Sequence, residues 1–278
     1  MIGTLFIVAT PIGNLDDISL RAIKVLQQVD LIAAEDTRHS SRLLSHLGIS
    51  KKLFSLHEHN EYERIEYCLQ RLNNGLDIAL ISDAGTPLIS DPGFTLVRAM
   101  QKEGIKVSPI PGASSVIAAL SCAGLPTNEF SYFGFLSHKN SERLTKLEQL
   151  RQVQGTLVLL ESTHRIIRLL EQIQQVMGNV TIVLAKELTK SYENFIRGAA
   201  REILDLMEQD PALVKGEFVV LIDNIRRVDG NEKLTADKIL ISALMTELPV
   251  KKAVKVAVLL SESKKNALYQ LALDLRPE

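Results

Sequence analysis

Short apolar runs alternate with amphipathic segments through the first part of the chain. The run Thr4–Ala9 ends at Pro11 and Gly13, a combination typical of a buried strand followed by a turn. Between such runs, apolar residues recur every three to four positions, as they do on a helix with one buried face. This alternation predicts a mostly parallel sheet with helices on both faces. The expected strands cover residues 4–9, 30–34, 53–56, 77–81 and 106–109.

Single residues mark where some of these helices begin and end. Ser19 can accept a hydrogen bond from the first turn of the helix that follows it, so we expect it to be the N-cap. Gly48 is expected to end the next helix. Asp91 is expected to cap a later helix with Pro92 in its first turn, where proline has no amide hydrogen to lose.

The pattern breaks at Gly124–Asn128, and we place a domain boundary there. Residues 1–123 then form one α/β domain and residues 124–230 a second. Two expected strands of the second domain follow each other with no helix between them, which favours a mixed sheet. The fold class is therefore α/β, with two α/β domains. The expected strands of the second domain cover residues 130–135, 156–160, 180–185, 192–197 and 217–222.

Residues 231–278 form a third piece, a small helical tail domain with about three short helices broken at Pro249 and Ser261. The tail has eight basic and six acidic residues, whereas the chain as a whole has a net charge of −1. Phosphate groups would therefore bind here more readily than elsewhere, although a solvated helix face has the same composition. The basic residues that support this interpretation are Lys251, Lys252, Lys255, Lys264 and Lys265.

The composition excludes several classes of protein. Hydrophobic residues make up 46% of the chain and charged residues 23%, which is typical of a soluble globular protein. There is no apolar run of about 18 residues, so no membrane span is expected. Met1–Val8 has no basic leader, which favours a cytoplasmic location. Cys68 and Cys122 lie in apolar helical patterns, so we expect two buried thiols, no disulfide and no metal centre.

The polar loop Ser82–Gly93 directly follows a buried strand. Ligands of α/β proteins bind at this end of the sheet. Gly85 would let the backbone approach a ligand closely, and Asp83 offers a carboxylate. Thr10–Leu15 and Pro111–Ser115 follow two other strands in the same way, so we expect the three loops to converge on one pocket. None of them has the glycine pattern of a dinucleotide fold or a P-loop.

Charged residues also gather at three other strand ends, in Glu35–Arg38, Glu161–Arg165 and Lys186–Lys190. Buried charges are costly unless they are paired, so such clusters are either solvated salt bridges or groups with a chemical task. Glutamate and lysine could position a hydroxyl group or contact phosphate. The sequence leaves both interpretations open.

These motifs together resemble the tetrapyrrole-methylase-like superfamily of S-adenosylmethionine-dependent methyltransferases, in its branch that methylates ribosomal RNA. The resemblance covers essentially the whole chain, and Ser82–Gly93 is its most specific part. Thr163 and Lys186 depart from the usual pattern, which has proline and arginine there. A lysine keeps the charge but loses the planar fork of arginine. The other matching segments are Ala9–Leu15, Ala34–Arg38, Pro111–Ser115, Glu161–Arg165 and Glu187–Lys190.

The resemblance implies S-adenosylmethionine in a cleft between the two α/β domains, and a homodimer. It also implies 2′-O-methylation of a cytidine in the decoding centre of 16S rRNA. The basic charge of the tail leads us to expect that the tail is an RNA-docking module. The residues expected to bind the cofactor share a position just past strand ends: Pro11, Asp83, Gly85, Thr86, Ser114 and Ser115.

Proton removal and substrate positioning would need polar groups near the cofactor. The candidates for catalysis are Glu161, Lys186, Glu187 and Arg38, of which Arg38 is better suited to clamp phosphate or substrate. The candidates for RNA binding are basic residues of the strand ends and the tail: Arg38, Arg165, Lys190, Lys251, Lys252, Lys255, Lys264 and Lys265.

Two other functions remain open on the sequence. One is C-methylation of a tetrapyrrole or another small molecule, although Pro11-Ile12-Gly13 replaces the glycine-proline-glycine turn of that branch. The other is a non-catalytic RNA-binding factor in ribosome assembly that uses the basic tail.

Overall fold

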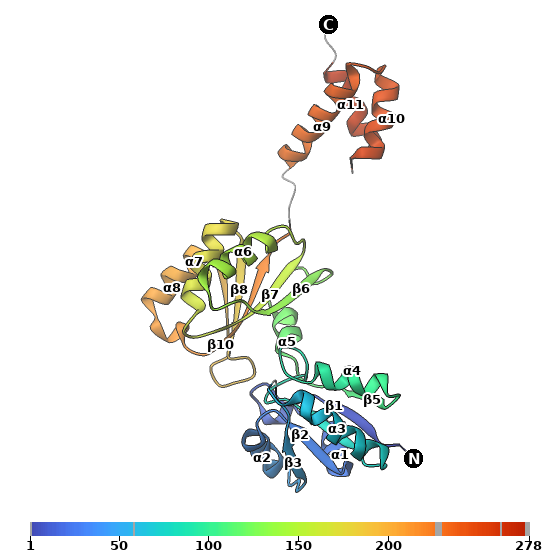
Figure 1. Cartoon of the computed structure of the whole chain (residues 1–278). Helices are drawn as coiled ribbons and strands as arrows, with labels where there is room; N and C mark the ends of the chain where they lie inside the picture. The colour runs from blue at the N-terminus through green and yellow to red at the C-terminus, as the bar shows by residue number, and fades with distance from the viewer. Residues whose placement is uncertain (1, 58, 226–229, 262, 276–278) are drawn as a thin grey trace. The chain divides into compact units, whose positions relative to one another are not determined.

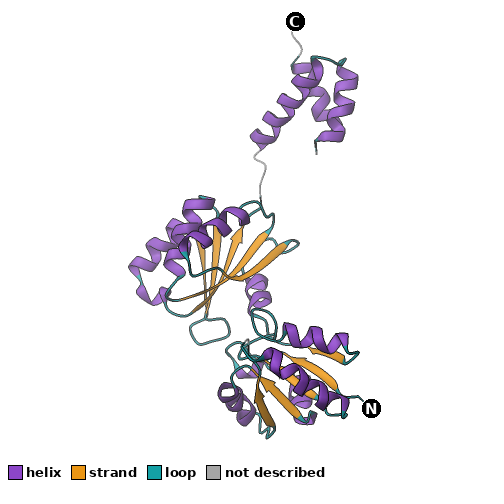
Figure 2. Ribbon diagram, viewed as in Figure 1, coloured by secondary structure: helices purple, strands orange, loops and turns teal. Residues whose placement is uncertain are grey.

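The computed structural model describes residues 2–57, 59–225, 230–261 and 263–275. The chain divides into two compact units, Met1–Ile225 and Arg226–Glu278. The first unit contains two five-stranded sheets, and the second is helical (Figures 1 and 2). The expected order along the chain, a parallel sheet, then a mixed sheet, then a helical tail, is confirmed. The boundary expected after Gly230 adjoins residues 226–229, which lie outside the described residues.

The first sheet is entirely parallel, with strand order β3-β2-β4-β1-β5. Both faces are covered, so every residue of β2 and β4 is buried. Helices α1 and α2 pack on one face, and α3 and α4 on the other. The strands are β1 Thr4–Val8, β2 Leu31–Ala34, β3 Lys52–Ser55, β4 Ile78–Ile81 and β5 Lys106–Ile110. The helices are α1 Leu20–Gln28, α2 Thr37–His46, α3 Glu61–Asn73, α4 Phe94–Lys102 and α5 Ser115–Cys122, with a 3₁₀ turn, η1, at Leu15–Asp17.

The second sheet has strand order β6-β7-β10-β8-β9 and is mixed. Only β6 and β7 pair in parallel, and the other neighbours are antiparallel. Helices α6, α7 and α8 cover one face, and α5 packs on the other through Val116, Ala119 and Leu120 (Figure 1). The strands are β6 Phe130–Phe135, β7 Thr156–Ser162, β8 Thr181–Lys186, β9 Asn194–Ala199 and β10 Glu217–Asp223. The helices are α6 Asn140–Leu150, α7 Ile166–Met177 and α8 Ala200–Gln209, with η2 at Pro211–Val214.

The second unit consists of α9 Gly230–Met245, α10 Val250–Leu260 and α11 Lys265–Asp274. Its own small core contains Ile241, Val254 and Leu268, one from each helix. Ser263, in the turn between α10 and α11, donates a hydrogen bond to the buried Asp237 of α9. That bond fixes the turn against the first helix of the unit. Among the described residues, no helix is long and apolar enough to cross a membrane.

Among the expectations about single residues, those for Ser19 and Cys68 are confirmed, and those for Asp91 and Cys122 are wrong. Ser19 does cap α1, accepting a hydrogen bond from Ala22 N. Asp91 does not cap α4, which begins at Phe94 with Gly93 as its N-cap. The chain first turns through left-handed conformations at Leu88 and Ser90, which places Asp91 before the helix. Cys68 is buried as expected, but Cys122 is exposed because it lies at the end of α5.

Candidate active site

A cavity of about 390 Å³ opens where the carboxyl ends of the first sheet face α5 and the second sheet. Its walls come from the loops after β1, β2, β4 and β5, and from strands β6, β7, β8 and β10. The volume lies within the range of small-molecule binding sites, about 300–1,000 Å³. We expected three loops to converge on one pocket, and all three line this cavity, around residues 12, 83–91 and 114–115.

Backbone pairing holds the first two loops together. Thr10 N donates to Gly85 O at 2.9 Å, and Gly85 N donates to Thr10 O at 3.1 Å. Gly85 has φ +82°, a conformation that side chains disfavour. Thr86 Oγ1 donates to Ala113 O at 3.2 Å, which attaches the third loop. The position of Gly85 is therefore fixed on both sides at the wall of the cavity.

Three carboxyl groups line one side of the cavity: Glu35, Asp83 and Asp91. Burial raises the pKa of Glu35, and the charge of Asp83 adds to the rise. Burial raises the pKa of Asp91 to about 6, with further contributions from Glu35 and Asp83. A group of acids that repel each other in a half-buried site favours a cationic ligand, whose charge would compensate theirs.

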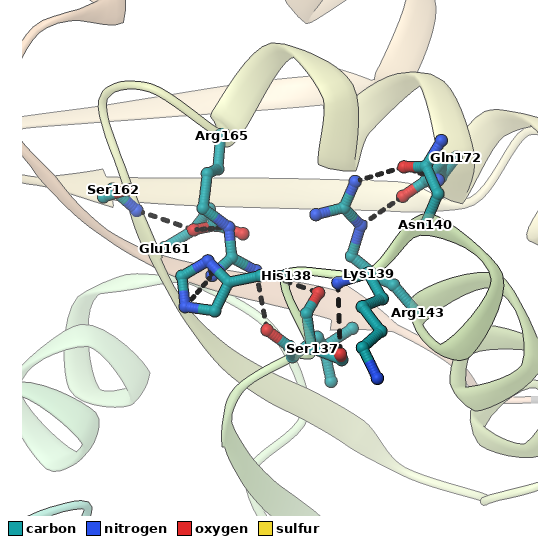
Figure 3. A network of polar contacts seen from close by, with 10 residues as sticks. Ser137, His138, Lys139, Asn140, Arg143, Glu161, Ser162, Arg165 and Gln172 are labelled. Atoms are coloured by element: carbon teal, nitrogen blue, oxygen red, sulfur yellow. Dashed lines mark hydrogen bonds and ion pairs between the residues drawn. The ribbon is translucent and has the colours of Figure 1, made fainter.

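Glu161 lies on the opposite wall, near the end of β7 (Figure 3). Its side chain is 1% exposed. Oε1 accepts a hydrogen bond from Ser162 N at 2.9 Å and lies 3.2 Å from Arg165 Nε. Oε2 is buried and has no hydrogen-bond partner among the described residues. Burial raises the pKa of Glu161, and the charges of Arg165 and Arg143 oppose the rise. One carboxylate oxygen is thus held by Ser162 and Arg165, while the other is buried and unpaired among the described residues.

Lys190 lines the cavity beside Leu188 and Glu217. Its Nζ pairs with Glu187 Oε1 at 3.1 Å and with Glu217 Oε2 at 2.9 Å. The loop that carries it has left-handed residues at Glu187 and Thr189. Thr189 Oγ1 accepts a hydrogen bond from Asn14 N at 3.0 Å, so this loop contacts the first loop of the parallel sheet.

The structure brings together most of the residues that the sequence singled out near the cofactor, but not all of them. Pro11 is buried next to Ile12, which lines the cavity in its place. Lys186 is buried away from the cavity, and its Nζ donates to Ala212 O at 2.8 Å. Glu187 is engaged with Lys190. The expected residues that line the cavity are Asp83, Gly85, Thr86, Ser114, Ser115, Glu161 and Lys190.

The two arginines among the candidates differ in their surroundings. The Arg38 side chain is 91% exposed and pairs only with Asp36, at 3.4 Å, among the described residues. Arg165 is 15% exposed, and its Nη2 donates to Leu136 O at 2.6 Å. Arg38 is therefore available to a large partner, whereas Arg165 is mostly used inside the protein.

Sequence reasoning missed several residues of the cavity wall, among them Tyr132, Phe135 and Ser90. Tyr132 Oη and Ser90 Oγ are 2.6 Å apart, which joins β6 to the loop after β4. Strand β6 has a bulge between Tyr132 and Gly134, and Gly134 has φ +61°. A glycine inside an expected strand is a signal for such a bulge, and bulges re-aim side chains towards sites.

Comparison with known proteins assigns the family. Residues 4–204 match the family of Tetrapyrrole (Corrin/Porphyrin) Methylases, and residues 235–276 match the RsmI C-terminal HTH domain. The chain belongs to the tetrapyrrole methylases. Within this family it is 47% identical over 273 residues to Ribosomal RNA small subunit methyltransferase I of Haemophilus influenzae, covering 98% of this chain and 96% of that protein. The protein of the same name from Escherichia coli O157:H7 is 48% identical, with 98% and 95% covered.

Solved structures of other proteins share the fold. Diphthine synthase aligns with a TM-score of 0.62 and 16% identity, covering 79% of this chain and 90% of that one. A uroporphyrin-III C-methyltransferase from Thermus thermophilus, complexed with S-adenosyl homocysteine, aligns with a TM-score of 0.55 and 16% identity, covering 81% and 99%. S-adenosylmethionine is thereby confirmed as the cofactor expected of this methyltransferase family.

The residues of the cavity fit this cofactor. S-adenosylmethionine carries a positively charged sulfur and an ammonium group, and three carboxyl groups line the cavity. Hydroxyl groups of Thr86, Ser114 and Ser115 and the backbone around Gly85 offer hydrogen bonds to its polar atoms. Among the described residues there is no group of three or more metal-binding side chains.

Proposed function

We propose that this tetrapyrrole methylase transfers a methyl group from S-adenosylmethionine to the 2′-hydroxyl of a cytidine in the decoding centre of 16S rRNA. The names of the bacterial relatives support ribosomal RNA of the small subunit as the substrate. The observation that carries the chemistry is Glu161, a buried carboxylate on the cavity wall with one oxygen free.

The cofactor, when bound, supplies a methyl carbon attached to a positively charged sulfur, a good leaving group for attack by oxygen. A ribose hydroxyl attacks more readily if its proton is removed, and a positioned general base contributes about 10²–10⁴-fold. We assign this task to Glu161 Oε2. The hydrogen bond from Ser162 and the ion pair with Arg165 hold Oε1, so the free oxygen keeps a fixed direction.

We assign the remaining candidates by their surroundings. Asp83, Gly85, Thr86, Ser114 and Ser115 line the cofactor side of the cavity. Arg38 is exposed near Glu35 and would contact RNA phosphate. Lys186 and Glu187 are engaged inside the protein rather than with the reacting atoms, because their polar atoms bind Ala212 and Lys190.

The second unit would dock the RNA. The five tail lysines that the sequence analysis singled out are all exposed: Lys251, Lys252, Lys255, Lys264 and Lys265. None of them forms an ion pair with another described residue. Lysines that lack acidic partners are available to phosphates. We also propose that the protein acts in the cytoplasm as a homodimer, which the family resemblance implies and analytical ultracentrifugation would test.

A methyl-transfer assay tests the proposal. Radioactive S-adenosylmethionine is incubated with the protein and, in separate reactions, with small ribosomal subunits, free 16S rRNA or uroporphyrinogen III. We expect label in rRNA, recovered as 2′-O-methylcytidine after nuclease digestion, and about 10²–10⁴-fold less in Glu161→Gln. Label in uroporphyrinogen III, or on a cytosine base, would overturn the proposal. RNA binding without any transfer would instead favour an assembly factor.

A further inference from the structure

The surroundings of Glu161 include an arginine that the reaction proposed above does not use. Arg165 lies in the segment between β7 and α7, four residues after Glu161. The guanidinium makes three kinds of contact inside the protein (Figure 3). Nε lies 3.2 Å from Glu161 Oε1, Nη2 donates to Leu136 O at 2.6 Å, and Nη1 lies 3.2 Å from His138 Nδ1.

Two of these contacts anchor the guanidinium on the segment that follows β6. The bond to the carbonyl of Leu136 is charge-assisted and short, which makes it a strong anchor. A guanidinium fixed in this way presents its Nε to the Glu161 carboxylate in one orientation. Arg165 therefore connects the β6–α6 segment to the reacting carboxylate at the end of β7.

The contact with Glu161 is an ion pair without hydrogen-bond alignment. Arg165 Nε and Glu161 Oε2 are both buried, and within the described part of the chain neither has a hydrogen-bond partner. Catalytic hydrogen bonds are often poorly aligned without substrate and tighten when it binds.

We propose that Arg165 is a positioning residue that orients the Glu161 carboxylate and keeps it ionised, and that it does not bind RNA. The inference deepens the proposed function, because it rests on Glu161 as the base. An arginine with 15% exposure and internal partners is poorly placed to reach phosphate. This differs from the expectation from sequence, which places Arg165 among the RNA-binding residues.

Other charged groups face Glu161 as well. Arg143 of α6 is buried and bonded to Gln172 and Asn140, and His138 precedes α6. Both lower the pKa of Glu161, after Arg165. Desolvation raises the pKa of Glu161, and the two arginine charges oppose this rise. Arg165 has the larger effect of the two arginines, so its loss should raise the pKa further. The proton would then stay on Glu161 to higher pH.

The test compares Arg165→Gln, Arg165→Lys and the control Arg168→Gln. Arg168 is exposed on α7, one turn from Arg165, and is not among the main causes of the pKa shift of Glu161. The first measurement needs no turnover. Protein labelled with ¹³C at the glutamate carboxyls is titrated by NMR, and the Glu161 signal is assigned by its loss in Glu161→Gln. We expect Arg165→Gln to raise the Glu161 pKa, and Arg168→Gln to leave it in place.

The second measurement is the pH profile of methyl transfer to rRNA. We expect Arg165→Gln to move the acid limb of kcat/KM to higher pH and to lower kcat by up to about 100-fold, with KM for RNA nearly unchanged. Arg165→Lys keeps the charge, so its acid limb should stay near that of the wild type while kcat falls. Thermal unfolding confirms that each variant is folded.

Three results would overturn the inference. One is an unchanged Glu161 pKa in folded Arg165→Gln. Another is a kcat that stays at the wild-type value. The third is a rise in KM for RNA with a salt slope less steep by about one, which marks a lost phosphate contact. If Glu161→Gln keeps full activity, the proposed base is wrong, yet the NMR titration still decides whether Arg165 controls Glu161.

Discussion

At the scale of the residue, the cavity holds a carboxyl group that folding places in an unfavourable position. The pKa of Asp91 is raised from 3.8 to about 6, mainly by burial. The folded protein therefore binds this proton more tightly than the unfolded chain does. The stabilisation is fully present below about pH 4 and is lost as pH rises through 6. Ionised Asp91 then costs stability at neutral pH.

Asp91→Asn should consequently stabilise the protein without cofactor at pH 8, by about 2 kcal/mol after allowance for partial exposure of the side chain. The gain should shrink at pH 5, where the wild-type carboxyl is mostly protonated. Urea unfolding at pH 5 and at pH 8 measures the gain in unfolding free energy at each pH. Asp17→Asn, an exposed carboxyl of η1, is the control and should show no such dependence. A gain that is equal at pH 5 and pH 8 would contradict the assignment.

The sequence predicted correctly which loops line the cavity, but not which charged side chains point into it. Asp83 and Ser114 directly follow strands, and that position alone brings them to one edge of the sheet. Lys186 and Arg165 also occur at strand ends, but their direction depends on partners far along the chain. Ala212 binds Lys186, and Leu136 binds Arg165. No local pattern encodes these contacts.

At the scale of the element, the loop after β4 depends on one glycine. Gly85 has φ +82°, and a Cβ there would lie 3.3 Å from Ile12 Cγ2. Gly85→Ala should cost about 1–2 kcal/mol of stability through the left-handed backbone, and should also weaken cofactor binding by crowding the cavity wall. Isothermal titration calorimetry measures the binding.

Gly104→Ala separates the two effects. Gly104 has φ +72°, but a Cβ there meets no atom within 4 Å. The stability of the Gly104→Ala protein should fall by about as much as that of Gly85→Ala, while its affinity for the cofactor stays at the wild-type value. Equal affinities in the folded Gly85→Ala and Gly104→Ala proteins would mean that the loop position is not part of the cofactor site.

The elements themselves were largely predictable, because buried strands give continuous apolar runs. The expected strand 130–135 coincides with β6, and 217–222 falls one residue short of β10. The expected start of α4 was wrong, because the backbone is left-handed at Leu88 and Ser90. A left-handed conformation can be anticipated from the sequence at a glycine, but not at these two residues. The packing of α5 on the second sheet is likewise a property of tertiary structure, because its sequence only shows that it is apolar.

At the scale of the whole molecule, the basic tail should control affinity for RNA independently of the cofactor site. Replacing five of its exposed lysines by glutamine should weaken rRNA binding. It should also make the dependence of log K on log salt less steep, by up to about 3 to 4 if each lysine binds one phosphate. Filter binding at several salt concentrations measures this slope. Affinity for S-adenosylmethionine should not change. The lysines replaced are Lys251, Lys252, Lys255, Lys264 and Lys265.

A control for general charge loss is available on the first unit. Lys24, Lys102 and Lys106 are exposed on and around the parallel sheet, far in sequence from the tail. Their replacement by glutamine should affect RNA binding less per lysine than the tail substitutions do. A tail variant with an unchanged salt slope would mean that its lysines only solvate the helices.

The position of β10 affects the order in which the molecule can form. β10 lies between β7 and β8, although it is the last strand of the chain. During synthesis, the parallel sheet has all its strands once residue 110 has emerged, whereas β7 and β8 must wait for residues 217–223 with a gap of about 10 Å between them. Glu217, Phe218 and Val219 of this strand also form part of the cavity wall. A nascent or truncated chain that lacks β10 therefore has an incomplete cavity wall, and we expect it to gain the capacity to bind cofactor only when the sheet closes.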